Sequence, residues 1–180
     1  MQINVKSILK QGGAVALVFL ILCVITSNSE RLYNKAYRWD AAGYHAYLPA
    51  VLIYNDMSFD FHKKESGHPK GEFYRGKDKK INRYSLGVAF LQAPFFGIAH
   101  LTSKFFDRKS NGYSVIYKKF LAFGAIFYAS LGLLFLGFTL NRYFSVKTSN
   151  LAIIAVGFAT NLVYYTILDL MMSHVYSFFL

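Results

Sequence analysis

Cysteine, proline and acidic side chains are all scarce in this chain of 180 residues. It has one cysteine, Cys23, three prolines, and 9 acidic against 20 basic side chains, which gives a formal net charge of +11. A lone cysteine forms no intrachain disulfide and has no partner at the spacing of a metal site. We therefore expect Cys23 to pack as an apolar residue inside the first hydrophobic run.

Charge of either sign is also limited, since 16% of the residues are charged while 54% are hydrophobic and 18% aromatic. A soluble domain of this length carries more charge and fewer aromatic residues. The composition therefore predicts a polytopic membrane protein. Its basic residues gather in residues 63–83 and beside apolar segments, which suits anionic lipid headgroups or phosphates. No nucleic-acid recognition motif is present, so nucleic acid is not an expected partner.

The first apolar run, at about residues 12–27, follows Lys6 and Lys10 and leads straight into polar and charged residues. It lacks the small-residue cleavage site of a signal peptide, so it is predicted to be an uncleaved transmembrane helix. The lysines before it place its N-terminus in the cytoplasm by the positive-inside rule. The segment after it would then face outward.

Two later runs, at about 116–140 and 149–168, are also predicted to span the membrane. A surface helix is expected at about 40–54, where aromatic side chains would lie at headgroup depth. The fold class is therefore all-α, with transmembrane helices and surface helices. Because the chain stops within an apolar segment, we expect it to be the N-terminal part of a longer protein.

Residues 84–106 are apolar but interrupted by Gln92, Pro94 and His100, and the sequence leaves open whether they cross the membrane or lie along it. If they do not cross, Asp169 and His174 emerge on the same face as the loop after the first span. If they cross, these two residues lie on the opposite face. The positive-inside rule favours crossing, because the lysines and arginines of residues 104–119 would then be cytoplasmic.

Asp40 is the residue of greatest chemical interest, because it is a single carboxylate within the aromatic, weakly polar run 38–50 after the first span. One interpretation is a helix N-cap without further chemistry. The other is a carboxylate at the boundary between water and lipid, where it meets a lipid headgroup and a polar substrate together.

Several short motifs together resemble the N-terminal part of the GT-C class of membrane glycosyltransferases. They are Asp40 just after the first helix, the aromatic-rich helix that follows, the basic loop, the Arg83-Tyr84-Ser85-Leu86-Gly87 start of an amphipathic segment with Pro94-Phe95-Phe96, and an acidic residue or histidine that ends a later span. Within the class, the chain is similar to the protein O-mannosyltransferase and aminoarabinose transferase branch. The resemblance implies that 84–106 lies along the membrane, so that 28–115 forms one outer loop and Asp40, Asp169 and His174 share the outer face.

The resemblance also implies the activity: transfer of a sugar from a polyprenyl-phosphate donor to an acceptor, on the extracytoplasmic face of the bacterial inner membrane. Asp40 matches the first acid of the family's acidic motif and is the expected base, whereas Ala41 stands where a second acid is common. Asp169 or His174 falls where the family places a further acidic residue. Arg83 falls near the family's phosphate-binding cation. Further candidates for substrate binding are Lys79, Lys80, Tyr44 and His45.

The sequence leaves open whether Asp40 acts directly or through a divalent metal.

It also leaves open two other classes of protein. A transporter or flippase of lipid-linked glycans would need polar residues at the membrane midplane, and the two later spans hold only weakly polar groups there, such as Tyr128, Ser130 and Asn161. A non-catalytic membrane scaffold is the third class, which Ala41 favours because it removes the paired carboxylate. The oligomeric state is not predicted.

Overall fold

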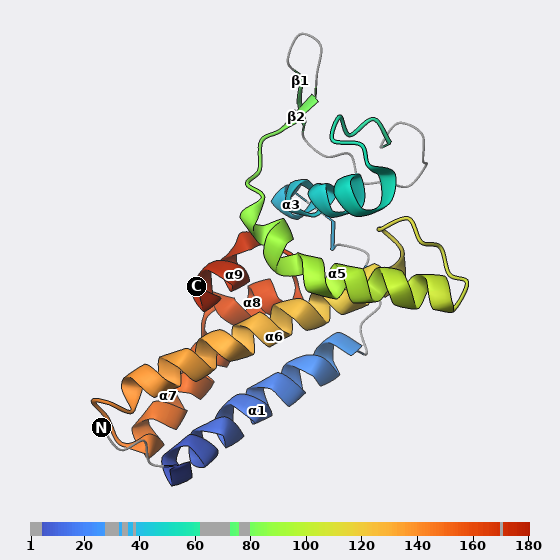
Figure 1. Ribbon diagram of the computed structural model, residues 1–180. Helices are drawn as coiled ribbons and strands as arrows, with labels where there is room; N and C mark the ends of the chain where they lie inside the picture. Colours follow the sequence, from blue (N-terminus) through green and yellow to red (C-terminus); the bar gives the residue numbers. More distant parts are fainter. Residues whose placement is uncertain are drawn as a thin grey trace.

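The structure is a computed structural model that describes residues 5–27, 33, 36–37, 39–61, 73–75, 80–169 and 171–180. The chain is mostly helical, as its composition predicts. Long helices form a bundle, and a layer of shorter elements lies across one end of it (Figure 1).

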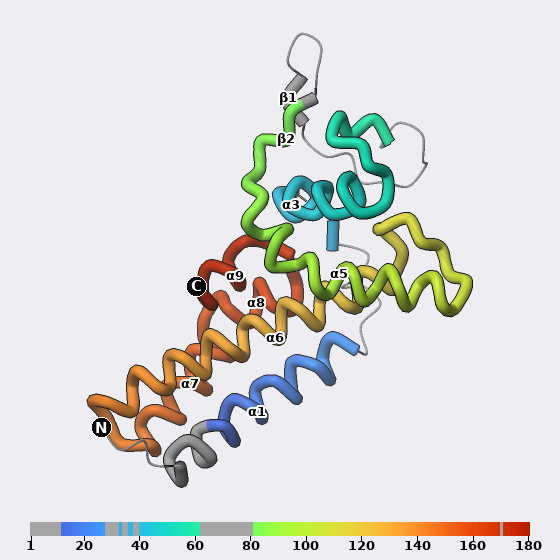
Figure 2. Tube along the Cα trace, in the orientation of Figure 1, coloured from blue at the N-terminus to red at the C-terminus, as the bar shows by residue number. Residues whose placement is uncertain are grey.

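The bundle is built from α1, Val5–Ser27, α6, Val115–Leu140, α7, Val146–Ala159, and α8, Asn161–Ile167. α1 and α6 run antiparallel, so that the C-terminal end of α1 lies beside the N-terminal end of α6 (Figure 2). Where α1 crosses α7, Gly157 leaves room for Val18, whose Cγ1 would be 3.2 Å from a Cβ at that position. The four helices share one buried cluster, which contains Val15, Val18, Leu22, Ile126, Leu133, Ile153 and Ile167.

Within the described part of the chain, α6 is the one helix that is long and apolar enough to cross a membrane by itself. α7 and α8 make a second candidate if they are counted as one broken span, and α1 has a shorter apolar stretch, Gly12–Ser27. Three membrane spans therefore stay a prediction.

The sequence suggested one continuous helix over 149–168, but the structure divides this stretch into α7 and α8, bent by 56°. Thr160 lies at the bend in an extended conformation, with φ −123° and ψ 176°. Its hydroxyl donates to the Val156 carbonyl at 2.7 Å and accepts from the Leu162 N–H at 3.2 Å. One side chain thus ends α7 and caps α8, because it satisfies backbone groups that a break leaves unpaired.

The layer across the end of the bundle holds α3, Trp39–Pro49, the π-helix η1, Ala50–Tyr54, and α5, Gly87–Phe105. A two-stranded antiparallel hairpin, β1, Phe73–Arg75, and β2, Lys80–Asn82, extends away from the helices (Figure 1). α3 and α5 lie side by side and point the same way: Gly43 of α3 meets Tyr84 before α5 begins, and Pro49 meets Gly112 after α5 ends.

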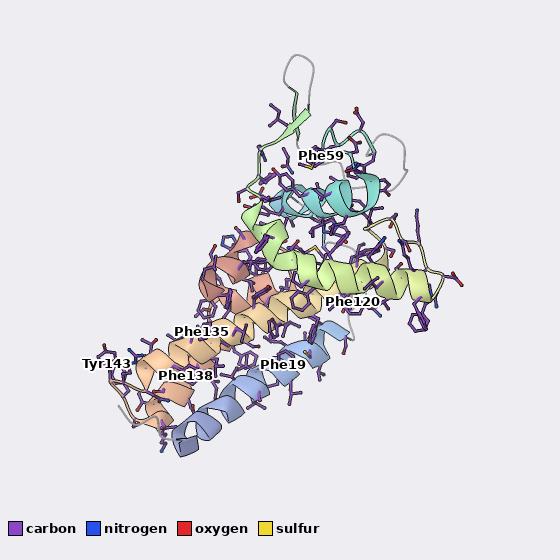
Figure 3. The ribbon with its side chains drawn as sticks, in the orientation of Figure 1. Phe19, Phe59, Phe120, Phe135, Phe138 and Tyr143 are labelled. Carbon is purple, nitrogen blue, oxygen red and sulfur yellow. The ribbon has the colours of Figure 1, made fainter. Side chains whose placement is uncertain are left out.

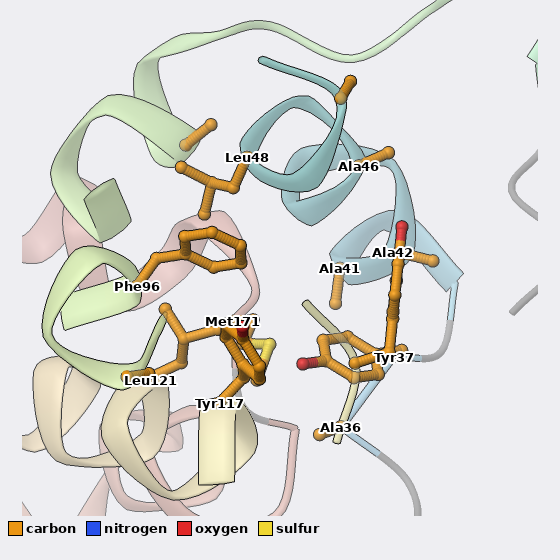
Figure 4. Packing of buried hydrophobic residues seen from close by; sticks show 14 of the residues in the cluster. Ala36, Tyr37, Ala41, Ala42, Ala46, Leu48, Phe96, Tyr117, Leu121 and Met171 are labelled. Atoms are coloured by element: carbon orange, nitrogen blue, oxygen red, sulfur yellow. The ribbon is translucent and has the colours of Figure 1, made fainter. Parts of the chain in front are cut away.

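α5 is buried on two sides, by α3 and by α6. Phe96 of α5 is 0% exposed and lies between Leu48 of α3 and the Tyr117 and Leu121 side chains of α6 (Figure 4). Phe95 packs on α6 as well, where Gly124 carries no side chain: a Cβ there would come within 2.8 Å of the Phe95 ring. Fully buried phenylalanine contributes several kcal/mol, so α5 fixes the layer to the bundle.

The last helix, α9, Ser173–Phe179, is attached to α5 by polar contacts. The Gln92 side-chain amide donates to the Tyr176 hydroxyl at 3.1 Å and to the Met171 carbonyl at 3.4 Å. Gln92, a polar residue in the apolar first half of α5, thus ties this helix to the C-terminal segment.

We expect Gly124→Ala to destabilise the protein, because the added methyl group would displace the Phe95 ring from α6. Overpacking of this kind costs about 1–3 kcal/mol. Gly97→Ala is the matched control on α5, since no atom lies within 4 Å of a Cβ there. Thermal unfolding in detergent should show a lower midpoint for G124A and no loss for G97A; equal midpoints would contradict this account of the α5–α6 contact.

Candidate functional site

The carboxylate of Asp40 is joined to the guanidinium of Arg83 through the phenol of Tyr84. The Tyr84 hydroxyl donates to Asp40 Oδ1 at 2.8 Å, and Arg83 Nη2 donates to the Tyr84 oxygen at 2.6 Å. The Arg83 guanidinium also lies 4.9 Å from the centre of the Tyr84 ring. The structure therefore brings together the two residues that the sequence proposed as base and phosphate-binding cation, with Tyr84 between them.

This arrangement depends on how the chain before α5 is held against α3. The Asn82 side-chain amide donates to the Gly43 carbonyl at 2.8 Å, and its oxygen accepts from the Tyr84 N–H at 3.1 Å. The Tyr47 hydroxyl donates to the Tyr84 carbonyl at 2.7 Å. Gly43 leaves the space that the Tyr84 ring fills, because a Cβ at this position would overlap the ring. Two side chains, Asn82 and Tyr47, and one glycine thus fix the direction of the phenol.

The electrostatics keep the phenol protonated. Burial raises the pKa of Tyr84, and its hydrogen bond to the negative Asp40 carboxylate raises it further, while the hydrogen bond from Arg83 acts in the opposite direction. A protonated phenol can donate to Asp40 at neutral pH. Asp40 lies in the first turn of α3, where the helix dipole favours a negative charge.

Asp169 and His174 lie at the C-terminal segment, and no contact in the described structure joins either of them to Asp40. Asp169 is half-buried just after α8, and its N–H donates to the Tyr164 carbonyl at 3.2 Å. His174 is exposed, and its ring stacks on Tyr165 with centroids 3.8 Å apart.

The backbone between these two residues approaches α3 nevertheless. Met171 has a left-handed conformation, φ 73°, and is 0% exposed in the same buried cluster as Ala41, the neighbour of Asp40. A non-glycine residue held at positive φ is uncommon and costs energy that the surrounding packing must offset. The packing therefore fixes Met171, which lies between Asp169 and His174 in the chain, in the buried cluster that includes residues of α3.

Tyr44 and His45, both proposed to bind substrate, occupy different surroundings. The Tyr44 ring lies 5.1 Å from the Tyr84 ring, edge to face, and packs against the buried cluster that contains Val175 and Tyr176 of α9. Tyr44 thus links the Asp40 site to the C-terminal segment.

His45, proposed to bind substrate, lies in the core. It is 0% exposed, and its Nε2 lies 2.9 Å from the Gly112 carbonyl, which can only accept, so Nε2 carries the proton. The rings of Tyr37 and Tyr113 lie 4.4 Å and 5.1 Å from it. His45 therefore joins α3 to the turn before α6.

The structure gives no side-chain contacts for the two remaining substrate-binding candidates, Lys79 and Lys80. Lys79 lies outside the described residues, and Lys80 belongs to β2, of which the structure describes the backbone. Among the described residues, no group of three potential metal ligands includes Asp40: Ala41 supplies no second carboxylate, and Oδ1 accepts the hydrogen bond from Tyr84.

Tyr84 is the functional candidate that sequence reasoning missed. It lay inside the Arg83-Tyr84-Ser85-Leu86-Gly87 motif, but one tyrosine among 14 has no feature that marks it. The available signal was Gly43, a glycine inside a predicted helix, which is unfavourable unless another group needs the space.

The chain was compared with models of protein families, with curated proteins and with solved structures, and nothing matches it in any of the three. The resemblance to GT-C enzymes rests on the short motifs alone.

We expect Tyr84→Phe to lower the free energy of unfolding by about 1 kcal/mol, because it removes the hydrogen bonds to Asp40 and from Arg83 while the ring stays in place. Tyr143→Phe is the control, since Tyr143 is exposed in the turn after α6. Denaturant unfolding followed by circular dichroism measures both. Equal losses in the two variants would remove the energetic role of the Tyr84 hydroxyl.

The difference in unfolding free energy between wild type and Y84F should also depend on pH. Because the pKa of Tyr84 is raised by folding, its hydroxyl contributes stability that is fully present below the pKa of an unfolded tyrosine, about 10, and is lost as the pH rises through the folded value. The difference in unfolding free energy between wild type and Y84F should therefore be constant at neutral pH and decrease in alkaline solution. A difference that grows with pH would contradict the assignment.

Proposed function

We propose that this chain is part of an integral membrane glycosyltransferase that moves a sugar from a polyprenyl-phosphate donor to an acceptor hydroxyl on the extracytoplasmic face. The Arg83–Tyr84–Asp40 chain of hydrogen bonds carries the proposal. It sets a cation and a carboxylate a few ångströms apart at one end of an apolar bundle, with Arg83 exposed.

The arrangement of α5 supports a site on one face of the membrane. If the bundle of α1, α6, α7 and α8 lies in the bilayer, α5 lies between α3 and the N-terminal half of α6, at the end of the bundle that carries Asp40 (Figure 1). α3 continues into η1 and ends at Asn55 in a left-handed conformation, φ 47°. Two helices packed side by side across the end of a bundle fit the membrane surface better than its interior.

The surface of the bundle supports membrane insertion. Leu17, Leu20 and Val24 of α1 are exposed, and so are Leu151 and Ile154 of α7. Aromatic side chains follow α6 from Phe120, near α5, to Phe138, beside the turn at Tyr143 (Figure 3). Exposed apolar side chains in this number favour contact with lipid or with another protein surface over contact with water.

The chemistry needs one base and one cation. The acceptor oxygen attacks the anomeric carbon while Asp40 takes the acceptor proton, and the bond between the anomeric carbon and the phosphate oxygen breaks. The electron pair leaves with the polyprenyl phosphate, whose added negative charge the Arg83 guanidinium stabilises through paired N–H donors.

Tyr84 has a positioning role in this scheme. Without donor it holds Arg83 and Asp40 in one orientation, since it accepts from the first and donates to the second. When Arg83 turns to the donor phosphate, the phenol keeps its bond to Asp40 and the carboxylate stays directed at the site.

Asp40→Asn should reduce sugar transfer by about 10²–10⁴-fold, because the amide cannot take a proton. Asp107→Asn is the matched control: Asp107 is exposed at φ 48°, a conformation that asparagine also adopts readily. Transfer from a radiolabelled polyprenyl-phosphate sugar into membrane acceptors gives the rates, and membrane fractionation checks insertion. Undiminished transfer by D40N would remove Asp40 from the catalytic role.

The topology has its own test. Single cysteines at Lys109, Tyr143 and His174, in a Cys23→Ala background, should be labelled from outside at 109 and 174 but not at 143, because Tyr143 lies in the turn at the far end of α6. An impermeant thiol reagent on intact cells makes the measurement. Labelling at 143 with protection at 109 would reverse the orientation and exclude an outer site at Asp40.

A further inference from the structure

α5 has an apolar face that no described element covers. Apolar side chains recur along it at intervals of three and four residues, which places them on one side of the helix. Phe105 is 82% exposed, Phe90 75% and Leu101 69%. The exposed apolar residues of this face are Leu86, Phe90, Pro94, Ile98, Leu101 and Phe105.

The other face of α5 already holds the contacts to α3 and α6, through buried residues such as Ala89, Phe96 and Ala99. α5 is therefore apolar on both sides, unlike a surface helix of a soluble protein. A contiguous exposed apolar patch of this kind marks an interaction surface.

The C-terminal end of this face carries a cluster of cations. Lys104, Arg108 and Lys109 are exposed within six residues, beside the exposed rings of Phe105 and Phe106. The cations lie among apolar side chains that would enter a lipid layer. One anion, Asp107, lies among them, so the cluster keeps a positive charge.

A buried serine fixes the backbone of this cluster. Ser103 is 0% exposed, and its hydroxyl donates to the Lys109 carbonyl at 3.2 Å and to the Arg108 carbonyl at 3.4 Å. The Arg108 N–H donates to the Ser103 carbonyl at 2.8 Å, and Asp107 takes a left-handed conformation. The chain is thus turned back in a defined way, with the three cations at its outside.

We propose that the exposed face of α5 lies in the lipid of the outer leaflet and that Lys104, Arg108 and Lys109 bind the phosphates of anionic phospholipids. Charge complementarity carries the choice of lipid over a second copy of the chain: a copy would meet the same cations, whereas anionic headgroups neutralise them. Phe105 and Phe106 then reach the boundary of the acyl chains while the cations stay at phosphate depth. The inference rests on the proposed membrane location, not on sugar transfer.

A tryptophan at Phe105 tests the depth of the face. F105W in a Trp39→Phe background, reconstituted in phospholipid vesicles, should be quenched strongly by phospholipids brominated on their acyl chains. I81W in the same background is the control, because Ile81 is exposed on the hairpin away from the helices. If the W39F background does not fold, a fluorophore on F105C in a C23A background gives the same readout.

The charge is tested with the same reporter. Quenching by brominated forms of phosphatidylglycerol and phosphatidylcholine gives the relative binding constant of the two lipids. Phosphatidylglycerol should bind about fivefold more tightly, which is the effect expected of one cation near an anionic surface. K104Q/R108Q/K109Q should bring the relative binding constant close to one. R142Q/K147Q, which removes two exposed cations at the other end of α6, should leave it unchanged.

Three results would overturn the proposal. Quenching of F105W no stronger than that of I81W would place the face outside the lipid. Equal binding of the two lipids, unaffected by the triple substitution, would remove the anionic-lipid site. A blue-shifted F105W emission that brominated lipid leaves unchanged, together with a dimeric mass, would assign the face to a second copy of the chain. Each result stands whether or not the protein transfers sugar.

Discussion

The burial of α5 between α3 and α6 is the constraint on which the rest of the structure depends. Phe96 fills the space among Leu48, Tyr117 and Leu121, and Phe95 fills the space over Gly124. These contacts hold the surface layer to the bundle, and through Gln92 they also hold the C-terminal segment. The direction of α5 sets where the chain before it, with Arg83 and Tyr84, meets Asp40.

Where Arg83 and Tyr84 meet Asp40, the packing of α5 against α3 determines the hydrogen bonds of the site. Tyr84 lies between the carboxylate and the guanidinium, because its hydroxyl takes one hydrogen bond from Arg83 and gives one to Asp40. In the proposed transfer, Arg83 donates to the phosphate and Asp40 takes the acceptor proton. The relative position of the two groups depends on Asn82 and Tyr47, which hold the backbone before α5 against α3.

Sequence patterns predicted the helical class and the positions of most helices, because long apolar runs and aromatic periodicity are local properties. They could not predict the break at Thr160, where one hydroxyl serves two helix ends. Asp40 was singled out by its place in the sequence and Arg83 by the resemblance, as the base and the phosphate-binding cation of one site. Their connection through Tyr84 was not predictable, because it depends on a tertiary contact across Gly43. The burial of His45 was not predictable for a similar reason, because its partners, the Gly112 carbonyl and the rings of Tyr37 and Tyr113, come from other parts of the chain.

The contact between Gly43 and Tyr84 limits how the site can change in evolution. A side chain at position 43 takes the space of the ring, and a smaller residue at position 84 leaves a hole over α3. Each single replacement removes the phenol from Asp40, so the two positions can drift only as a pair. Among homologues, loss of the glycine should accompany loss of the tyrosine, and such chains would need a different group to connect the acid and the cation.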